Sequence, residues 1–227
     1  MDVDLARHLA NDMVEGGAFD PAFSARLQID HGQSQAIQNL LDGIYVPIVP
    51  IVVNVFAPPL PTFARCREFA AALRESLERE SSSKRVVVIE SGGLSHRLPW
   101  PDWREPHGDD EDFMVQARLD GRDNWSQYDI RRREIIRAAQ SSITPSFDDY
   151  VLRLFEKGNA DEMADYSTDY VEKEAGNGAQ ELRTWLMMST LLRDVAGERV
   201  AYEAIPEWLT GMGITILDPT TQKQEIS

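Results

Sequence analysis

The sequence predicts an α/β protein in which a mixed sheet is flanked by helices. Two runs rich in Val and Ile, residues 46–56 and 85–90, lack polar alternation, which is typical of strands covered on both faces. Segments with the apolar spacing of amphipathic helices occur before, between and after these runs. The chain of 227 residues has room for one large domain or two small ones, each with a hydrophobic core.

The predicted helices and strands alternate along the chain. Residues 3–14 place Leu5, Leu9 and Met13 four apart, which predicts a helix that packs on a core. Residues 97–126 scatter tryptophans among acidic residues, and we expect a long surface excursion there. Further helices are expected at about 62–80, 127–141, 147–157 and 179–194, and short closing strands at 199–204 and 213–217.

Charge and cysteine content exclude several classes of function. The chain has 23 Lys and Arg against 38 Asp and Glu, a net charge of −15 that repels phosphate backbones and anionic lipids. Residues 44–64 carry no charge, but five prolines there would break a membrane-spanning helix. Cys66 is the single cysteine, and the N-terminus lacks the pattern of a signal peptide. We therefore expect a cytoplasmic protein without nucleic-acid or membrane partners.

Two histidines stand in loops that are suited to chemistry. His31, in Asp-His-Gly, is either an acid–base group or a solvated residue of a turn. His96 ends the segment Ser91–His96, whose paired glycines follow a predicted buried strand. This segment matches neither a phosphate-binding loop nor a serine hydrolase elbow. An exposed histidine in a tight turn is the alternative for His96.

Glu181 is the third candidate. On a helix from Ala179 it would share a face with Trp185, Met188 and Leu192, which places a carboxylate on an apolar side. A carboxylate there must pair with an arginine, take up a proton or bind a metal. On burial statistics alone, a structural salt bridge is the commoner outcome.

Four motifs in this order resemble the class III extradiol ring-cleavage dioxygenases over nearly the whole chain. They are Gln28–Gly32, Val46–Asn54 with Ala57–Pro61, Glu90–His96, and Glu174–Trp185. The resemblance implies a single domain over residues 1–227 and a non-haem Fe(II) site that opens a catecholic ring with dioxygen.

The same resemblance assigns roles to individual residues. It makes Glu181 a metal ligand, His31 and His96 acid–base groups, and Asn54 a residue that fixes substrate or oxygen. A catechol must lose protons to chelate iron, and a later step needs an acid, so the reaction has work for both histidines.

Two departures from the family pattern affect these expectations. The family's two ligating histidines come from an N-terminal βα portion with no match in this sequence, so we expect a domain that lacks that portion. Only Glu181 then matches a metal-ligand position, and we expect the chain alone to hold little iron. The second departure is Gln180, where relatives often carry histidine.

Other readings of the sequence remain open. The main rival is a non-catalytic or truncated subunit of a dioxygenase assembly, which keeps the fold and an assembly surface but binds no iron on its own. We expect a homo- or hetero-oligomer under either interpretation. The presence of His31, His96 and Glu181, three polar groups expected in one pocket, argues for the enzyme. The two ligating histidines that have no match in this sequence argue for the rival. An unrelated hydrolase using His96 is supported by its loop alone. Manganese in place of iron is a further alternative.

Overall fold

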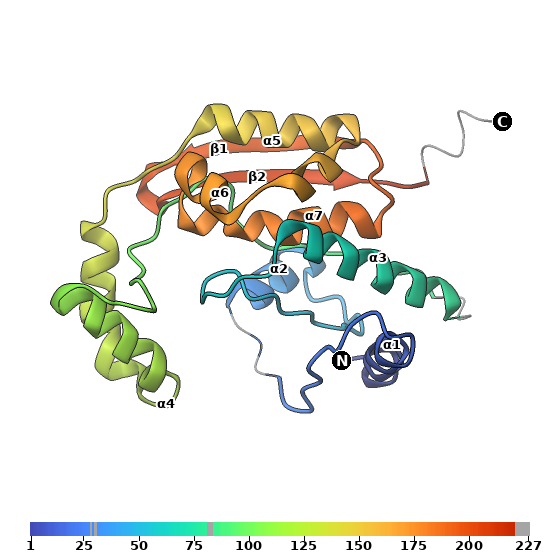
Figure 1. The fold of residues 1–227 in the computed structure, drawn as a ribbon, viewed down its shortest axis with the longest axis horizontal. Coiled ribbons are helices and arrows are strands. Elements are labelled where there is room, and N and C mark those ends of the chain that lie inside the picture. Colours follow the sequence, from blue (N-terminus) through green and yellow to red (C-terminus); the bar gives the residue numbers. More distant parts are fainter. Residues whose placement is uncertain (28, 30, 81–83, 221–227) are drawn as a thin grey trace.

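The computed structural model describes residues 1–27, 29, 31–80 and 84–220, without the side chains of His31, Arg122 and Asp123 (Figure 1). Its α-helices are α1 (Val3–Glu15), α2 (His31–Leu41), α3 (Phe63–Arg79), α4 (Gly108–Ala138), α5 (Pro145–Lys157), α6 (Thr168–Ala175) and α7 (Leu182–Leu191). Its strands are β1 (Gly197–Ile205) and β2 (Thr210–Leu217). Short 3₁₀ helices are η1 (Ala160–Asp165), η2 (Asn177–Glu181) and η3 (Pro206–Trp208).

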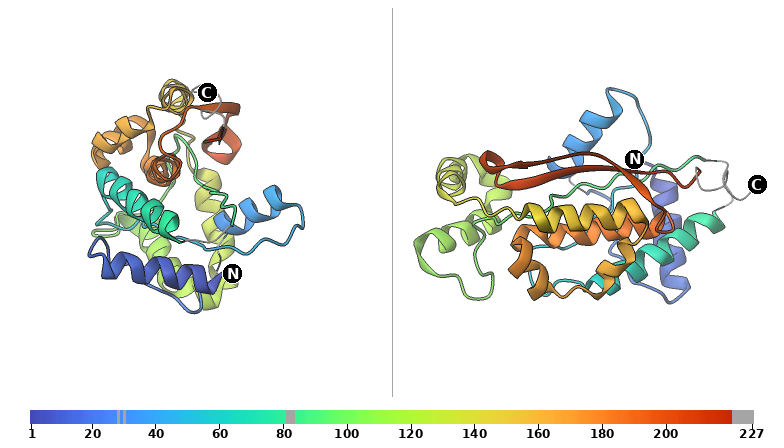
Figure 2. Two further views of the ribbon diagram at one scale, coloured as in Figure 1. Left: turned by 90° about the vertical axis from the view of Figure 1, so that its right-hand side faces the viewer. Right: turned by 90° about the horizontal axis from the view of Figure 1, so that it is seen from above.

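The strands form an antiparallel hairpin, with η3 in its turn. The register runs from Gly197 opposite Leu217 to Ile205 opposite Thr210, with an irregularity after Arg199. Helix α5 packs against both strands, and α7 lies beside α3. Figures 1 and 2 show α5 and α7 running along the length of the hairpin. The α/β class is therefore confirmed, with helices predominating over a small sheet.

The main core lies among α5, α6, α7 and the hairpin. Its fully buried members include Val151, Leu152, Phe155 and Leu186, and Trp185 is 4% exposed. Tyr202 of β1 and Leu217 of β2 pack against it from the sheet. This core surrounds the segment that carries His96.

Local chemistry explains where the principal helices begin and end. The Thr62 side chain accepts from the backbone N–H of Arg65 and caps α3, and Ser167 caps α6 in the same way. Pro145 begins α5, and Gly158 ends it in the left-handed conformation. The N-terminal helix is confirmed as α1, whose Leu9 and Met13 pack on Leu73 of α3.

The two predicted buried strands differ from the structure. Among the described residues, 46–56 and 85–90 belong to no strand, and Val52 and Val87 are 63% and 73% exposed. The carbonyl of Ile48 accepts from the N–H of Asp2, but neither run joins the sheet. Apolar composition identifies a segment suited to a sheet interior, whereas a strand also needs a hydrogen-bonded neighbour.

Other boundaries also differ from the predictions. Helix α4 begins at Gly108, inside the expected excursion, and extends past a kink at Asn124 to Ala138. It lies at one end of the molecule (Figure 1). Helices α2 and α6 were not predicted, and the expected helix at 179–194 is divided into η2 and α7. The structure describes no helix with the length and hydrophobicity required to cross a bilayer.

Candidate active site around His96 and Glu181

The segment that carries His96 is fixed at both edges by backbone hydrogen bonds. On one edge, Leu94 N–H donates to the Gly211 carbonyl at 3.1 Å, and Gly211 N–H donates to the Ser95 carbonyl at 2.9 Å. On the other, His96 N–H donates to the Ala175 carbonyl at 2.8 Å, and Gly178 N–H donates to the His96 carbonyl at 3.0 Å. The start of β2 and the turn after α6 therefore hold His96 between them.

His96 is buried, with 5% of the residue exposed, which excludes the exposed-turn alternative. Its Nδ1 lies 2.8 Å from the carbonyl oxygen of Leu94. A carbonyl only accepts hydrogen bonds, so we assign the ring hydrogen of neutral His96 to Nδ1. The unprotonated Nε2 then lies 3.9 Å from Oε2 of Glu181.

Glycines enclose the imidazole. A Cβ atom at Gly178 would overlap the His96 ring, and one at Gly93 would lie 2.9 Å from its Cε1. Gly176 has a φ of 92°, and a Cβ there would overlap the His96 carbonyl. These contacts explain why glycines are required beside His96, because any side chain would displace the ring.

Glu181 occupies the junction of η2 and α7, whereas a position within one continuous helix was expected. Its carboxylate accepts a hydrogen bond from the backbone N–H of Gly93, and the side chain is 24% exposed. Trp185 lies one turn further along and donates from Nε1 to the Gly92 carbonyl at 3.0 Å. The apolar face predicted from Trp185 is present, and Glu181 lies at its edge, facing the glycine loop.

Glu90 is a site residue that the sequence analysis missed. It is partly buried, and its Oε1 accepts from the Thr184 hydroxyl. A Cβ at Gly92 would lie 2.9 Å from both Glu90 Oε1 and Glu181 Cβ, so the two glutamates flank this glycine. Removal from water, reinforced by the negative charge of Glu181, raises the pKa of Glu90 well above its usual range. Its position two residues before Gly92 was the available signal.

A buried arginine lies beside Glu181 in sequence but is directed elsewhere. Arg183 is fully buried, and its guanidinium donates to Gln180, the Thr168 hydroxyl and the Pro61 carbonyl. Burial lowers the pKa of Arg183. The Gln180 side chain thus has a structural contact, since it accepts from the guanidinium and donates to the Thr168 carbonyl.

The first of the four motifs, which carries His31, is only partly described by the structure. His31 begins α2, and only its backbone is described. The hydroxyl of Ser91 donates to the carbonyl of neighbouring Gly32 at 3.0 Å, which brings the start of α2 to the glycine loop. Gln28 and Asp30 of the first motif lie outside the described residues.

Asn54 is exposed and holds a local turn. Its Nδ2 donates to the Ala57 carbonyl at 2.6 Å, and its Oδ1 accepts from Ala57 N–H at 3.1 Å. The hydrogen bonds of the Asn54 side chain described here link it to residues within the segment 54–59. They do not connect Asn54 to His96 or Glu181.

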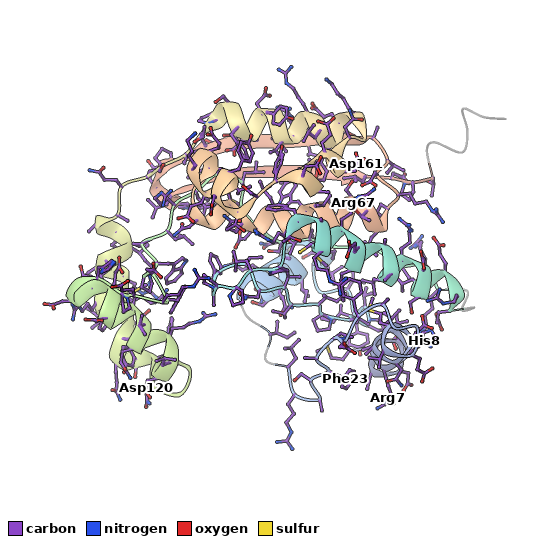
Figure 3. The ribbon with its side chains drawn as sticks, in the orientation of Figure 1. Arg7, His8, Phe23, Arg67, Asp120 and Asp161 are labelled. Carbon is purple, nitrogen blue, oxygen red and sulfur yellow. The ribbon has the colours of Figure 1, made fainter. Side chains whose placement is uncertain are left out.

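The two histidines without a predicted role are exposed. His8 lies on α1, on the side of the molecule away from the hairpin (Figure 3). His107 precedes α4, and its backbone N–H donates to Glu111. Neither forms part of the cluster around His96.

A facial metal site of the kind that binds non-haem iron needs two histidines and one carboxylate. Among the side chains that the structure describes, which do not include that of His31, no group of three or more His, Cys, Asp or Glu is placed to hold a metal. Glu181, with its carboxylate anchored by Gly93 N–H, has the chemistry of a single oxygen ligand. The described residues therefore fit one ligand position and do not form a complete metal site.

Comparisons with known proteins agree with this picture. The family model described as "Catalytic LigB subunit of aromatic ring-opening dioxygenase" matches residues 1–213. A 2,3-dihydroxyphenylpropionate/2,3-dihydroxicinnamic acid 1,2-dioxygenase from Rhodococcus sp is 31% identical over 95% of this chain and 71% of its own length. Proteins of the same name from Escherichia coli (strain 55989 / EAEC) and Paraburkholderia xenovorans are 31% and 32% identical, over 93% and 92% of this chain and 70% and 69% of theirs.

Proposed function

The chain belongs to the family of catalytic LigB subunits of aromatic ring-opening dioxygenases, extradiol enzymes that cleave catechols, and on this premise we propose which of its residues act. His96 and His31 are the acid–base groups, Glu181 is a metal ligand, and Asn54 is a substrate-binding residue. The observation that carries the proposal is the buried His96, whose Nε2 faces the anchored Glu181 carboxylate at 3.9 Å.

His96 can accept a proton from a bound catechol. Hydrogen bonding of Nδ1 to Leu94 leaves the Nε2 lone pair available, and a neutral imidazole is a suitable base near neutral pH. Burial and the adjacent glycines hold the ring in one place, so little reorganisation is needed before the proton moves. The same atom, once protonated, can return the proton as an acid.

His31 and Asn54 have weaker support. The Ser91 to Gly32 hydrogen bond places the start of α2 beside the loop of His96, which supports a shared site for both histidines. Asn54 Nδ2 already donates to Ala57, so a substrate contact would have to share or replace that bond. For both residues, the resemblance supplies the role.

The family implies a metal cofactor, and we propose that it is Fe(II), with Glu181 as this chain's ligand. A bound metal would supply Lewis acidity and a site for dioxygen. His96 and His31 would move protons beside the metal, and Glu181 would hold it through one carboxylate oxygen. We propose a cytoplasmic oligomer that engages neither nucleic acid nor membrane, in line with the charge of −15.

The substrate class follows from the names of the relatives. Those proteins are named for 2,3-dihydroxyphenylpropionate and 2,3-dihydroxicinnamic acid. We propose a vicinal diphenol with a carboxylated side chain for this chain as well. Dihydroxyphenylpropionate is the first compound to test.

A subunit that does not bind iron on its own is the second candidate. The observation that favours it is the lack of a three-donor group among the described side chains. It predicts no ring cleavage at any iron concentration, whereas the proposed enzyme predicts weak cleavage that depends on added Fe(II).

The test titrates the purified chain with Fe(II) and measures the ring-opened product of 2,3-dihydroxyphenylpropionate by absorbance. We expect little iron to remain bound after desalting, because one carboxylate is a weak site. His96→Gln should lower the iron-dependent rate on the order of 10²-fold, the scale of lost acid–base help. Glu181→Gln should abolish it, and Glu198→Gln, at an exposed position of β1, is the matched control.

The outcomes separate the candidates. Unchanged rates in both His96→Gln and Glu181→Gln would refute the assigned site, and a wild-type chain inactive at every Fe(II) level would favour the non-catalytic subunit. Metal-free Glu181→Gln should melt at or above the wild-type temperature, because glutamine can still accept from Gly93 N–H. A large drop would instead indicate that Glu181 serves a structural ion pair.

A further inference from the structure

Asp148 is a fully buried carboxylate of α5. It is connected to His96 through the peptide group between Leu94 and Ser95. It is 0% exposed and accepts three hydrogen bonds. The donors are Ser95 N–H at 2.7 Å, the Ser95 hydroxyl at 2.8 Å and the Tyr202 hydroxyl at 2.8 Å. Burial raises the pKa of Asp148, and the bonds from Ser95 and Tyr202 counteract that rise.

The backbone of β2 closes over this carboxylate. A Cβ atom at Gly211 would overlap Asp148 Oδ2, so the strand approaches as closely as a glycine allows. Ser95 is held on its remaining sides, because its hydroxyl accepts from Thr144 N–H at 2.8 Å and its carbonyl accepts from Gly211 N–H. Asp148 and Ser95 therefore form a compact polar cluster, closed by Gly211, inside an apolar core.

One peptide unit links this cluster to the imidazole. The Ser95 N–H that donates to Asp148 and the Leu94 carbonyl that accepts from His96 Nδ1 belong to the same peptide group. A peptide group is planar, and its N–H and C=O point in opposite directions. A carboxylate that holds the N–H end therefore also sets the direction of the carbonyl end.

We propose that Asp148 is a positioning residue for His96. By holding Ser95 N–H it directs the Leu94 carbonyl at Nδ1, which keeps the ring hydrogen on Nδ1 and leaves the lone pair of Nε2 facing Glu181. The catalytic value of this arrangement rests on the acid–base role proposed for His96. The arrangement itself is a property of the folded chain, with or without metal.

The test reads the tautomer of His96 directly. Long-range ¹H–¹⁵N NMR spectra of ¹⁵N-histidine-labelled, metal-free protein distinguish Nδ1–H from Nε2–H, and His96→Gln identifies the His96 signal. Wild type should show Nδ1–H. Asp148→Ala removes every acceptor, so the signal should change to a mixture of the two forms.

Two further variants provide the controls. Asp149→Ala, at the next position of α5, loses hydrogen bonds to Arg153 and Arg199 but has none to Ser95, so it should retain the wild-type signal. Asp148→Asn keeps one oxygen that can accept from Ser95 N–H and should restore Nδ1–H. A merely structural role for Asp148 would lower the melting temperature without altering the tautomer.

Each result decides the proposal. An Nδ1–H signal retained in Asp148→Ala would overturn it. Loss of the Nδ1–H signal in Asp148→Asn would also overturn it, and this second variant can still be measured if Asp148→Ala does not fold. The spectra need neither iron nor catechol. If the tautomer follows Asp148 while His96→Gln leaves ring cleavage unchanged, the positioning stands and the proposed function fails.

Discussion

Single residues set the chemistry of this site, and Glu90 shows how. Its carboxyl is partly withdrawn from water and lies close to that of Glu181 across Gly92. Two carboxylates that share such a place resist being ionised together, so the folded chain favours a proton on Glu90. This has a measurable effect on stability.

We predict that Glu90→Gln stabilises the chain at neutral pH. The pKa of Glu90 is raised in the folded state, so its favourable contribution is complete below the ordinary value of 4.5 and is lost as pH rises through the raised value. The gain in melting temperature from Glu90→Gln should therefore grow as the pH rises above 4.5 towards neutral. Glutamine can still accept from the Thr184 hydroxyl.

Glu207→Gln, on the exposed turn of the hairpin, is the control and should not show this pH dependence. A Glu90→Gln chain that is less stable than wild type at the higher pH would mean that Glu90 is held ionised.

At the scale of elements, the glycines that follow helices α1 and α5 differ in how much space surrounds them. Gly158 ends α5 with a φ of 71°, and Gly17, after α1, has a φ of 67°. A Cβ at Gly158 would lie 2.7 Å from the Asp194 carbonyl oxygen, whereas nothing lies within 4 Å of one at Gly17. The two positions share a positive φ and differ in packing.

We therefore predict unequal costs for the same substitution. Gly17→Ala should lower the free energy of unfolding by about 1 kcal/mol, the cost of a left-handed alanine. Gly158→Ala should cost roughly 2 kcal/mol or more, because the Asp194 backbone must also move. Urea denaturation of both variants measures the difference. Equal losses in the free energy of unfolding would show that the backbone around Asp194 can move away at no cost.

At the scale of the whole molecule, stability is expected to be uneven. The core around α5 and α7 is dense, whereas residues 46–56 and 85–90 expose apolar side chains and lie outside the sheet. We predict that backbone amides of 86–89 exchange with solvent far faster than those of 212–216 in β2. Hydrogen exchange read by NMR measures both, and comparable protection would indicate that 85–90 pairs with a neighbour in solution.

The sequence predicted part of this architecture. Helix spacing located α1, α3 and α5, and the closing strands predicted at 199–204 and 213–217 fall within β1 and β2. Residues 46–56 and 85–90 were predicted as buried strands because composition reports apolar character and not pairing. His96 and Glu181 were identified from their motifs. Asp148 was not, because nothing near it in sequence indicates a partner 53 residues away.

The hydrogen bond between Ser95 and Asp148 also has a consequence for biosynthesis. Its partners are 53 residues apart, and Gly211, which closes over them, is made later still. At about 5–20 residues per second, a ribosome delivers Asp148 roughly 3–10 seconds after Ser95, and β2 after a further delay. During translation the segment that carries His96 lacks its hydrogen bonds to Gly211 until β2 has been made. The surroundings of His96 are thus completed late in vectorial folding, when the hairpin of β1 and β2 forms.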